Sequence, residues 1–307
     1  MATAFITHGA CLRHDMGSYH PECPSRLAAI DDQLISSGIA QYLQHHEAPL
    51  ATVEQLARAH PREYIDSVQA AAPARGIVHL DPDTAMSPGT WEAVLRAAGA
   101  AVLATDLVLE GRAENAFCSV RPPGHHATRN RAMGFCFFNN VAVAALHAIE
   151  HHGLERVAVV DFDVHHGNGT EDIFEDDERV LMVSTFQHPF YPYSGTESPA
   201  RNMVNVPLVA GTGSAGFREA VTTRWIPALE EFQPQMVFFS AGFDAHVEDD
   251  MAMMRLVDGD YGWVTREVKA VVDRSGAGRI VSVLEGGYAL SALGRSVVQH
   301  LRVLGEF

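Results

Sequence analysis

The sequence predicts an α/β fold: one three-layer α/β/α domain over residues 1–307, built on a mostly parallel sheet. Short β-branched runs alternate with longer helical patterns in the second half of the chain. These runs are apolar throughout, as in strands that are buried on both faces. We find no internal repeat, low-complexity tract or Pro/Ser-rich linker that would mark a domain boundary. Because parallel strands need long crossovers, strands separated by helices indicate a sheet covered by helices on both faces.

The individual elements follow from local patterns. The clearest helix of the first half is expected over residues 91–110, and a strand near 116–120 follows it. Further buried strands are expected over residues 157–160, 180–184, 236–240 and 280–284. Further helices are expected over residues 214–232, 260–274 and 291–304. Another helix is expected to end at His151 and His152, where imidazoles interact favourably with the helix dipole, so this pair is interpreted as structural.

Composition excludes several classes of protein. The chain has 307 residues, of which 47% are hydrophobic and 20% charged, which is ordinary for a globular protein and excludes disordered, collagen-like and small disulfide-rich chains. The 22 basic and 38 acidic residues give a net charge of −16. So acidic a surface repels nucleic acid and anionic membranes, so we expect neither as a partner, whereas a homo-oligomer is compatible with the sequence.

Cysteine usage and the N-terminus indicate a cytoplasmic protein. The four cysteines form no CxxC pair, which excludes a zinc ribbon and a dithiol redox motif. The first residues carry no basic segment followed by a long apolar stretch, as a secretory signal would. The longest apolar run, residues 97–104, is far too short to span a bilayer.

Unusual polar motifs follow four of the expected strands. They are Arg-Pro-Pro-Gly-His-His at 121–126, Asp-Phe-Asp-Val-His-His-Gly-Asn at 161–168, Ala-Gly-Phe-Asp at 241–244 and Glu-Gly-Gly-Tyr at 285–288. Ligand sites of open α/β sheets form at the carboxyl ends of strands. Core packing does not require His, Asp and Tyr at four strand ends, so we expect the functional site there.

A metal site is expected among these motifs. If residues 161–165 remain extended, their period of two places Asp161, Asp163 and His165 on one side of the chain. Asp244, from another strand end, could be a third ligand. Three protein ligands with one open position describe a catalytic zinc site, although Fe(II), Co(II) or Mn(II) would also suit these ligands. The alternative interpretation is a surface ion pair of Asp163 with His165 and a helix-capping Asp244.

Two further motifs suggest acid–base chemistry. His125 and His126 follow a rigid Pro-Pro-Gly turn, and the partner of each imidazole decides its role. A carboxylate partner favours the imidazolium, whereas an amide such as that of Asn168 orients the ring with less stabilisation of charge. Tyr288 could donate a hydrogen bond to an oxygen that becomes negative in a tetrahedral intermediate. The glycines before it would let the loop close over a substrate; the alternative is a tyrosine that only packs at a strand end.

Together the motifs resemble the zinc-dependent histone deacetylase family, which includes bacterial deacetylase-like amidohydrolases and acetylpolyamine amidohydrolases. The resemblance rests on residues 121–127, 134–140, 161–170, 240–244 and 285–288, and on His-Pro-Glu-Cys-Pro-Ser-Arg at 20–26, similar to the family's first active-site loop. It covers residues 8 to 290. It implies the arginase–deacetylase fold, with a mostly parallel eight-stranded sheet.

The resemblance also implies roles for individual residues. One Zn²⁺ per chain would be held by Asp163, His165 and Asp244. His126 would help to activate a water and then protonate the leaving amine, while His125, paired with Asp161, would stay charged. Tyr288 would polarise the acyl oxygen, and Asn168 resembles the class II branch. The substrate channel would be lined by Gly134, Phe135, Phe190, Met251, Gly286 and Gly287.

Potassium ions are implied as well. A structural K⁺ would lie under the zinc loop, bound by backbone oxygens of Asp161, Asp163 and His165 and by Ser184. A second K⁺ is implied near Phe174, Asp177 and Val180.

The predicted function is zinc-dependent hydrolysis of an acylated amine, with an N-ε-acetyl-lysine-type substrate favoured. Acetylpolyamine relatives can carry an acidic residue where this chain has Met251, although Glu248, Asp249 and Asp250 stand nearby. An acetylpolyamine amidohydrolase is therefore the first alternative. A two-metal ureohydrolase would need a carboxylate at Gly167, while His246 keeps that alternative open. A non-catalytic acyl-group reader is the remaining alternative, and none of the expected catalytic residues is missing.

Overall fold

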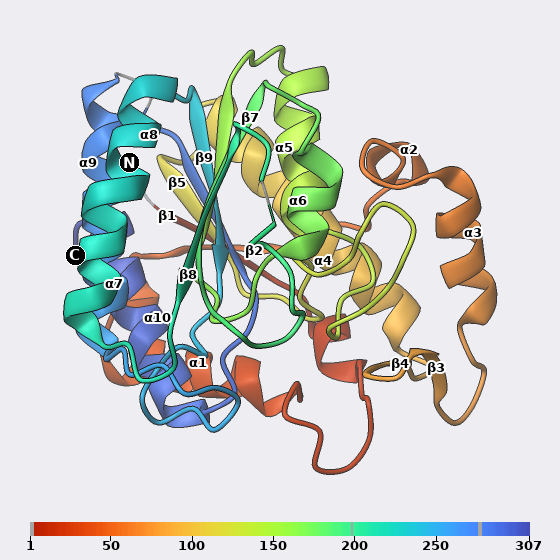
Figure 1. The fold of residues 1–307 in the computed structure, drawn as a ribbon. Helices are drawn as coiled ribbons and strands as arrows, with labels where there is room; N and C mark the ends of the chain where they lie inside the picture. The colour runs from red at the N-terminus through yellow and green to blue at the C-terminus, as the bar shows by residue number, and fades with distance from the viewer. Residues whose placement is uncertain (1–2, 198, 276–277) are drawn as a thin grey trace.

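The computed structural model describes residues 3–197, 199–275 and 278–307. Its centre is an eight-stranded sheet in the order β2-β1-β5-β10-β9-β6-β7-β8, in which every neighbouring pair is parallel (Figure 1). The strands span Thr3–Thr7 (β1), Gln44–Glu47 (β2), Asn115–Cys118 (β5), Val157–Asp161 (β6), Val180–Gln187 (β7), Met203–Leu208 (β8), Met236–Ala241 (β9) and Ile280–Leu284 (β10). A separate antiparallel pair comprises Val78–Asp81 (β3) and Thr84–Met86 (β4).

Helices cover both faces of the sheet (Figure 1). One face carries Thr90–Leu109 (α4), Asn140–Glu150 (α5) and Asn168–Phe174 (α6). The other carries Ser25–Ser36 (α1), Ser214–Ala220 (α7), Ile226–Phe232 (α8), Asp258–Arg274 (α9) and Leu290–Leu304 (α10). Val53–Leu56 (α2) and Arg62–Ala71 (α3) lie outside α4, and short 3-10 helices span Gly9–Arg13 and Ala40–Tyr42. The three-layer prediction is confirmed, and the sheet is entirely rather than mostly parallel.

Most predicted elements are present within a few residues of their expected bounds. The expected helix over 214–232 is instead interrupted by a π-helical turn, Val221–Trp225, just before Pro227. Proline has no N–H to donate to the helical ladder, which explains why the regular pattern changes there. β1, β2 and β8 are not among the predicted strands. β2 has the sequence Gln-His-His-Glu and is largely exposed, so no apolar run marks it.

The centre of the sheet is formed by the strand that comes last in the chain. β10 lies between β5 and β9, with Ile280 beside both Asn115 and Val237. All five of its residues are buried, as are all residues of β5, β6, β7 and β9. Because all strands run the same way, their carboxyl ends meet at one edge, the lower edge in Figure 1.

Of the described residues, none belongs to a helix with the length and apolar character needed to cross a membrane.

Acid sensitivity is expected from a buried histidine that supports α5. His60 Nε2 accepts a hydrogen bond from the backbone N–H of Asn139 (2.9 Å), the N-cap of α5, and His60 Nδ1 donates to the Arg129 carbonyl (3.1 Å). Burial lowers the pKa of His60 from 6.5 to about 4. Because the unfolded chain binds this proton more readily, its contribution to stability is complete above pH 6.5 and lost as the pH falls from 6.5 to about 4.

Urea unfolding should therefore show about 2 kcal/mol less stability at pH 5 than at pH 7 from this histidine alone. The matched variant His60→Gln offers the Asn139 N–H an amide oxygen that does not titrate in this range, so its stability should depend less on pH. Equal pH dependence of the two proteins would contradict the assignment.

Candidate metal centre and active site

Three predicted ligands meet at the carboxyl edge of the sheet. Asp163 and His165 follow β6, and Asp244 follows β9. His165 Nδ1 lies 3.0 Å from Asp163 Oδ1 and 3.2 Å from Asp244 Oδ2, and one donor atom from each residue lies within 4.8 Å of the others. All three side chains are buried. The alternative of a surface ion pair with a separate helix cap is therefore wrong.

The expected extension of the strand through residues 161–165 is not observed. β6 ends at Asp161, yet the alternation of side chains persists beyond it. The ring of Phe162 packs against Phe239 and Phe243 in the core, while Asp163 and His165 face the cluster. Packing of the apolar residues thus keeps the ligands on one side without a strand.

The donor atoms suit a divalent cation. Asp244 Oδ1 accepts the backbone N–H of Val164 (2.9 Å), but Asp244 Oδ2 is buried without a hydrogen-bond partner of acceptable geometry. Burial and the neighbouring Asp163 raise the pKa of Asp244 to about 6. Burial lowers the pKa of His165, but contacts with Asp163 and Asp244 outweigh it and raise the pKa to about 10. The cluster thus offers two carboxylate oxygens and one imidazole nitrogen close to one another. Zinc binds this combination of ligand atoms in proteins.

The two adjacent histidines have different partners, as the sequence analysis expected. His125 Nδ1 lies 3.0 Å from Asp161 Oδ2, and His126 Nδ1 lies 2.8 Å from Asn168 Oδ1. The two imidazole rings are 4.0 Å apart between centroids. The Asn168 amide nitrogen contacts Met133 Sδ (3.4 Å), which leaves its oxygen directed at His126.

These partners separate the pKa values of the pair. Burial lowers the pKa of His125, but the carboxylates of Asp163 and Asp161 more than compensate and raise it to about 10. Burial, followed by the charges of His125 and His165, lowers the pKa of His126 well below its usual value. At neutral pH His125 is therefore charged and His126 neutral. Two neighbouring groups with separated pKa values can divide the work, one supplying a fixed charge and the other acting as a base.

Glycines allow the backbone to approach this cluster closely. A Cβ on Gly286 would lie 2.1 Å from Asp244 Oδ2, and a Cβ on Gly134 would lie 2.3 Å from the His126 ring. Gly134 also has a φ of +57°, which other residues rarely adopt. Of the predicted channel residues, Gly134 and Gly286 thus border the cluster directly.

Arg26 contacts the Tyr288 ring, and Asp249 holds the backbone of Tyr288. The Arg26 guanidinium lies 5.0 Å from the Tyr288 ring centroid and donates to the Gly287 carbonyl (2.6 Å). Asp249 Oδ2 accepts the backbone N–H groups of Tyr288 (2.6 Å) and Ala289 (2.9 Å). Burial, followed by the charge of Asp244, raises the pKa of Tyr288 well above its usual value. The phenol is therefore a neutral hydrogen-bond donor near the ligand cluster.

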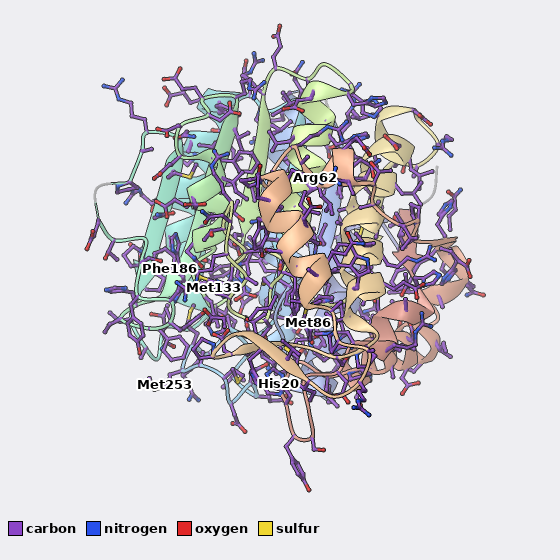
Figure 2. All side chains as sticks on the ribbon, turned by 90° about the vertical axis from the view of Figure 1, so that its right-hand side faces the viewer. His20, Arg62, Met86, Met133, Phe186 and Met253 are labelled. Carbon is purple, nitrogen blue, oxygen red and sulfur yellow. The ribbon has the colours of Figure 1, made fainter. Side chains whose placement is uncertain are left out.

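Aromatic rings surround the ligands. Phe190 stacks on His165 with 5.5 Å between centroids, and Phe135 meets Tyr288 edge-on at 6.0 Å. Tyr191 meets His126 edge-on at 5.2 Å. Met251, also expected in the channel, is half-buried on the loop after Asp244, and its backbone N–H donates to Asp249 Oδ1 (3.0 Å). Figure 2 shows Met253, two residues further along this loop, towards the lower end of the molecule.

Sequence reasoning missed the buried charges beneath the site. The Glu22 carboxylate forms ion pairs with both Arg26 and Arg121, and all three side chains are fully buried. Glu285 accepts the backbone N–H groups of Gly124 (2.6 Å) and His125 (3.1 Å), and burial raises its pKa to about 7. The signal in the sequence was that Glu22, Arg26, Arg121 and Glu285 lie inside the quoted motifs.

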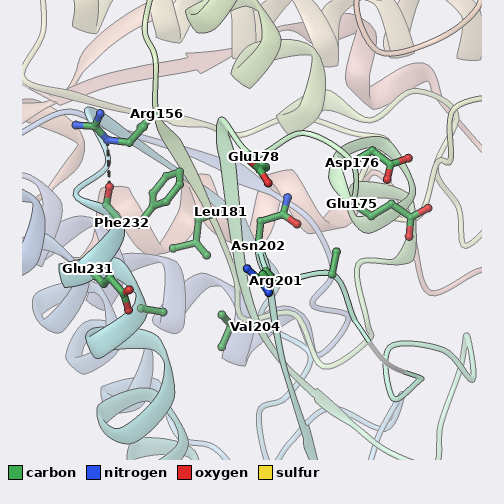
Figure 3. A pocket seen from close by; sticks show the side chains of 12 residues that line it. Arg156, Glu175, Asp176, Glu178, Leu181, Arg201, Asn202, Val204, Glu231 and Phe232 are labelled. Atoms are coloured by element: carbon green, nitrogen blue, oxygen red, sulfur yellow. Dashed lines mark hydrogen bonds between the residues drawn. The ribbon is translucent and has the colours of Figure 1, made fainter.

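A cavity of about 680 Å³ lies near the amino ends of the strands, opposite the carboxyl edge that carries the ligand cluster (Figure 3). It is lined near the amino ends of β6 and β7, by Arg156 and Leu181 among others, with Glu178, Arg201 and Glu231 around it. It contains neither the histidines nor the tyrosine discussed above, so it is not the candidate active site.

Comparisons with known proteins agree with this geometry. The histone deacetylase domain model matches residues 20–304. A histone deacetylase-like amidohydrolase of Pseudomonas aeruginosa is 39% identical over 311 residues, covering 94% of this chain and 82% of the relative. Polyamine deacetylase HDAC10 of Homo sapiens is 35% identical, covering 99% of this chain and 48% of the relative. The crystal structure of the HDA15 HD domain superimposes with a TM-score of 0.92 at 32% identity, covering 99% of this chain and 88% of that one.

Proposed function

The chain belongs to the histone deacetylase family, and from this premise we propose that it hydrolyses an acylated amine, releasing acetate or a short acyl acid from an N-ε-acetyl-lysine-type side chain. One observation carries the proposal: Asp163, His165 and Asp244 converge beside two histidines, of which His125 is charged and His126 is neutral. We also propose that residues 1–307 act as one catalytic domain, because the residues of the site come from both ends of the chain.

The geometry of His126 suits proton transfer. Its Nδ1 faces the Asn168 carbonyl oxygen and so carries the proton, which leaves the Nε2 lone pair free. A neutral imidazole can accept a proton from the attacking water and pass it to the leaving amine nitrogen when the acyl C–N bond breaks. Asn168 fixes the ring without stabilising the imidazolium as a carboxylate would.

His125 and Tyr288 would stabilise the charge that develops on the acyl oxygen. His125 stays protonated beside Asp161 and Asp163, so it places a fixed positive charge next to the reacting group. Tyr288 would donate its phenolic hydrogen to the same oxygen. Donors that are already oriented cost no reorganisation during the reaction.

Asp163, His165 and Asp244 would hold one Zn²⁺. When bound, Zn²⁺ supplies Lewis-acid polarisation of the acyl oxygen and lowers the pKa of a water. A structural K⁺ beneath the loop is supported by Ser184, whose hydroxyl oxygen is buried without a hydrogen-bond partner. The second K⁺ stays a prediction; the carbonyl oxygens of Phe174, Asp177 and Val180 lie together, each within 3.1 Å of the Asn202 amide nitrogen.

Acyl-lysine is favoured over an acylpolyamine by the charges near Met251. Glu248 pairs with Arg295 (2.7 Å), and Asp249 accepts backbone N–H groups, so neither carboxylate is free to meet a cationic substrate. Of Glu248, Asp249 and Asp250, only Asp250 is exposed and has no pairing partner within the described part of the chain. The acetylpolyamine alternative keeps its support from the likeness to a polyamine deacetylase.

The remaining alternatives lose support. A Cβ on Gly167 would lie 2.3 Å from Asp161 Oδ2, so the backbone leaves no room there for the extra carboxylate of a two-metal ureohydrolase. His246 Nε2 pairs with Asp258 (3.0 Å) instead of joining the ligand cluster. A non-catalytic acyl-group reader would not need a neutral and a charged histidine side by side.

The test is turnover of a fluorogenic acetyl-lysine peptide before and after chelation. We expect chelation to abolish activity and one equivalent of Zn²⁺ to restore it, because the ligands bind metal only when deprotonated and converged. kcat/KM should be higher for the peptide than for acetylputrescine. Activity that survives complete metal removal would refute the proposed chemistry, and a higher kcat/KM for acetylputrescine would reverse the assignment of substrate.

A further inference from the structure

A second histidine cluster lies far from the active site. It comprises His147, His151 and His152 at the carboxyl end of α5, together with Asp106 near the end of α4. α5 leads from the catalytic loops to the start of β6, so this cluster lies at the amino ends of the strands, opposite the Asp163 site. The three imidazole rings are mutually close, with centroids 4.8, 5.2 and 4.9 Å apart. His151 and His152 were predicted only to end a helix, and their contacts with His147 and Asp106 go beyond that.

Asp106 determines which nitrogens of the cluster are free. Its Oδ1 lies 2.7 Å from Nε2 of His147 and 2.7 Å from Nε2 of His152. When each Nε2–H donates to this carboxylate, the Nδ1 atom of a neutral ring is left with a lone pair. Metal-binding histidines show this same pattern, with the second ring nitrogen donating to a carboxylate that orients the ring.

His147 supplies the observation that a purely structural role does not explain. Its side chain is 4% exposed, and its Nδ1 is buried without a hydrogen-bond partner. A buried, unpaired imidazole nitrogen costs free energy unless it finds a ligand. One ring nitrogen, Nδ1 or Nε2, from each of the three histidines lies within 4.8 Å of the others, so the three rings are close enough to share an ion once they turn towards it.

We propose that His147, His151 and His152 form a second metal site, which takes a transition-metal ion of the kind that imidazole favours, such as Zn²⁺, Ni²⁺ or Cu²⁺. Asp106 orients the two rings that it contacts and does not bind the ion itself. His147 and His151 are one helical turn apart, a spacing at which two side chains share a face. The helix carboxyl end adds a favourable field for a cation.

Binding requires one side chain to move. His147 and His151 now stack with 15° between ring planes, and parallel rings cannot both direct in-plane lone pairs at one ion. His151 is exposed, so its ring can turn towards the ion at little cost. The bound ion would join the end of α5 to α4 through Asp106. Its effect would be on stability, because this site lies at the opposite edge of the sheet from the catalytic residues.

The test uses tag-free enzyme that already holds its active-site metal. Titration calorimetry with Zn²⁺ should show one further equivalent per chain, and elemental analysis should give a total of two. The double variant His151→Ala/His152→Ala should lose the further equivalent and keep wild-type turnover. Asp106→Asn should lower the affinity for the further Zn²⁺ by about 10–100-fold, as for other orienting carboxylates. His79→Ala, which removes an exposed histidine on β3, is the matched control and should change nothing.

Two further readouts separate this site from the proposed function. Saturating Zn²⁺ should raise Tm in the holoenzyme but not in the double variant, since an ion that binds only the folded state stabilises it. Cu²⁺ bound to the holoenzyme should show hyperfine coupling to imidazole nitrogens. If the active-site assignment failed, the wild-type total would fall to one, and that equivalent would still vanish in the double variant. A holoenzyme that binds no further Zn²⁺, or a double variant that binds it equally well, would overturn the proposal.

Discussion

Replacing Asp163 with alanine should remove metal binding at the active site and hydrolysis together. Asp163 Oδ1 lies 3.0 Å from His165 Nδ1, and Asp163 Oδ2 accepts the Gly286 N–H (2.9 Å). Loss of the Lewis acid should lower kcat by about 10³-fold or more, since metal chemistry contributes several kcal/mol to such reactions. Elemental analysis and peptide turnover, measured on the same sample, check both losses.

Stability must be separated from catalysis in this experiment. Removing one partner of a buried charged pair can cost about 3–5 kcal/mol, which is enough to unfold Asp163→Ala for reasons unrelated to metal. Asp163→Asn keeps the volume and can still accept the Gly286 N–H, and it should lose metal while remaining folded. Asp66→Asn, on the exposed face of α3, is the control and should keep both properties. An Asp163→Asn enzyme with full metal content would show that this carboxylate is not a ligand.

The second large effect is expected from Tyr288→Phe. The substitution removes one hydroxyl and leaves the ring against Phe135 and Arg26. If the phenol donates to the acyl oxygen mainly when that oxygen becomes negative, kcat should fall by about 10²–10³-fold with little change in KM. Steady-state kinetics with the acetyl-lysine peptide give both constants.

The metal content and Tm of Tyr288→Phe should stay at wild-type values, because no ligand and no buried packing is lost. Tyr193→Phe provides a matched control, since that tyrosine is 74% exposed. Wild-type kcat in Tyr288→Phe would mean that the ring only packs at the end of β10. A raised KM with unchanged kcat would instead assign the hydroxyl to substrate binding.

Much of the fold could be predicted because its central strands are continuously apolar. β6, β9 and β10 were each expected within one residue of their observed bounds. Edge strands were not predictable in this way: β2 is largely exposed, and β8 contains Pro207 and half-buried positions. Burial on both faces leaves a clear signal in the sequence, whereas pairing at an edge depends on neighbours that only the fold brings together.

The site was predictable where its chemistry lies within one motif. Asp163 and His165 are two residues apart, and both were expected to bind metal. The support from Glu22 and Arg26 was not predictable, because Glu22 contacts Arg121, 99 residues away, and Arg26 contacts Gly287, 261 residues away. The His147 cluster was also missed, since the orienting carboxylate, Asp106, comes from another helix.

The position of β10 has a consequence for how the protein is made. Its neighbours β5 and β9 leave the ribosome first, yet they pair with β10 and not with each other. Until residues 280–284 have been synthesised, the growing sheet consists of two halves with open, apolar inner edges. Such edges invite aggregation, and pairing between distant segments is slow. We therefore expect the nascent chain to need chaperone protection until its final strand closes the gap.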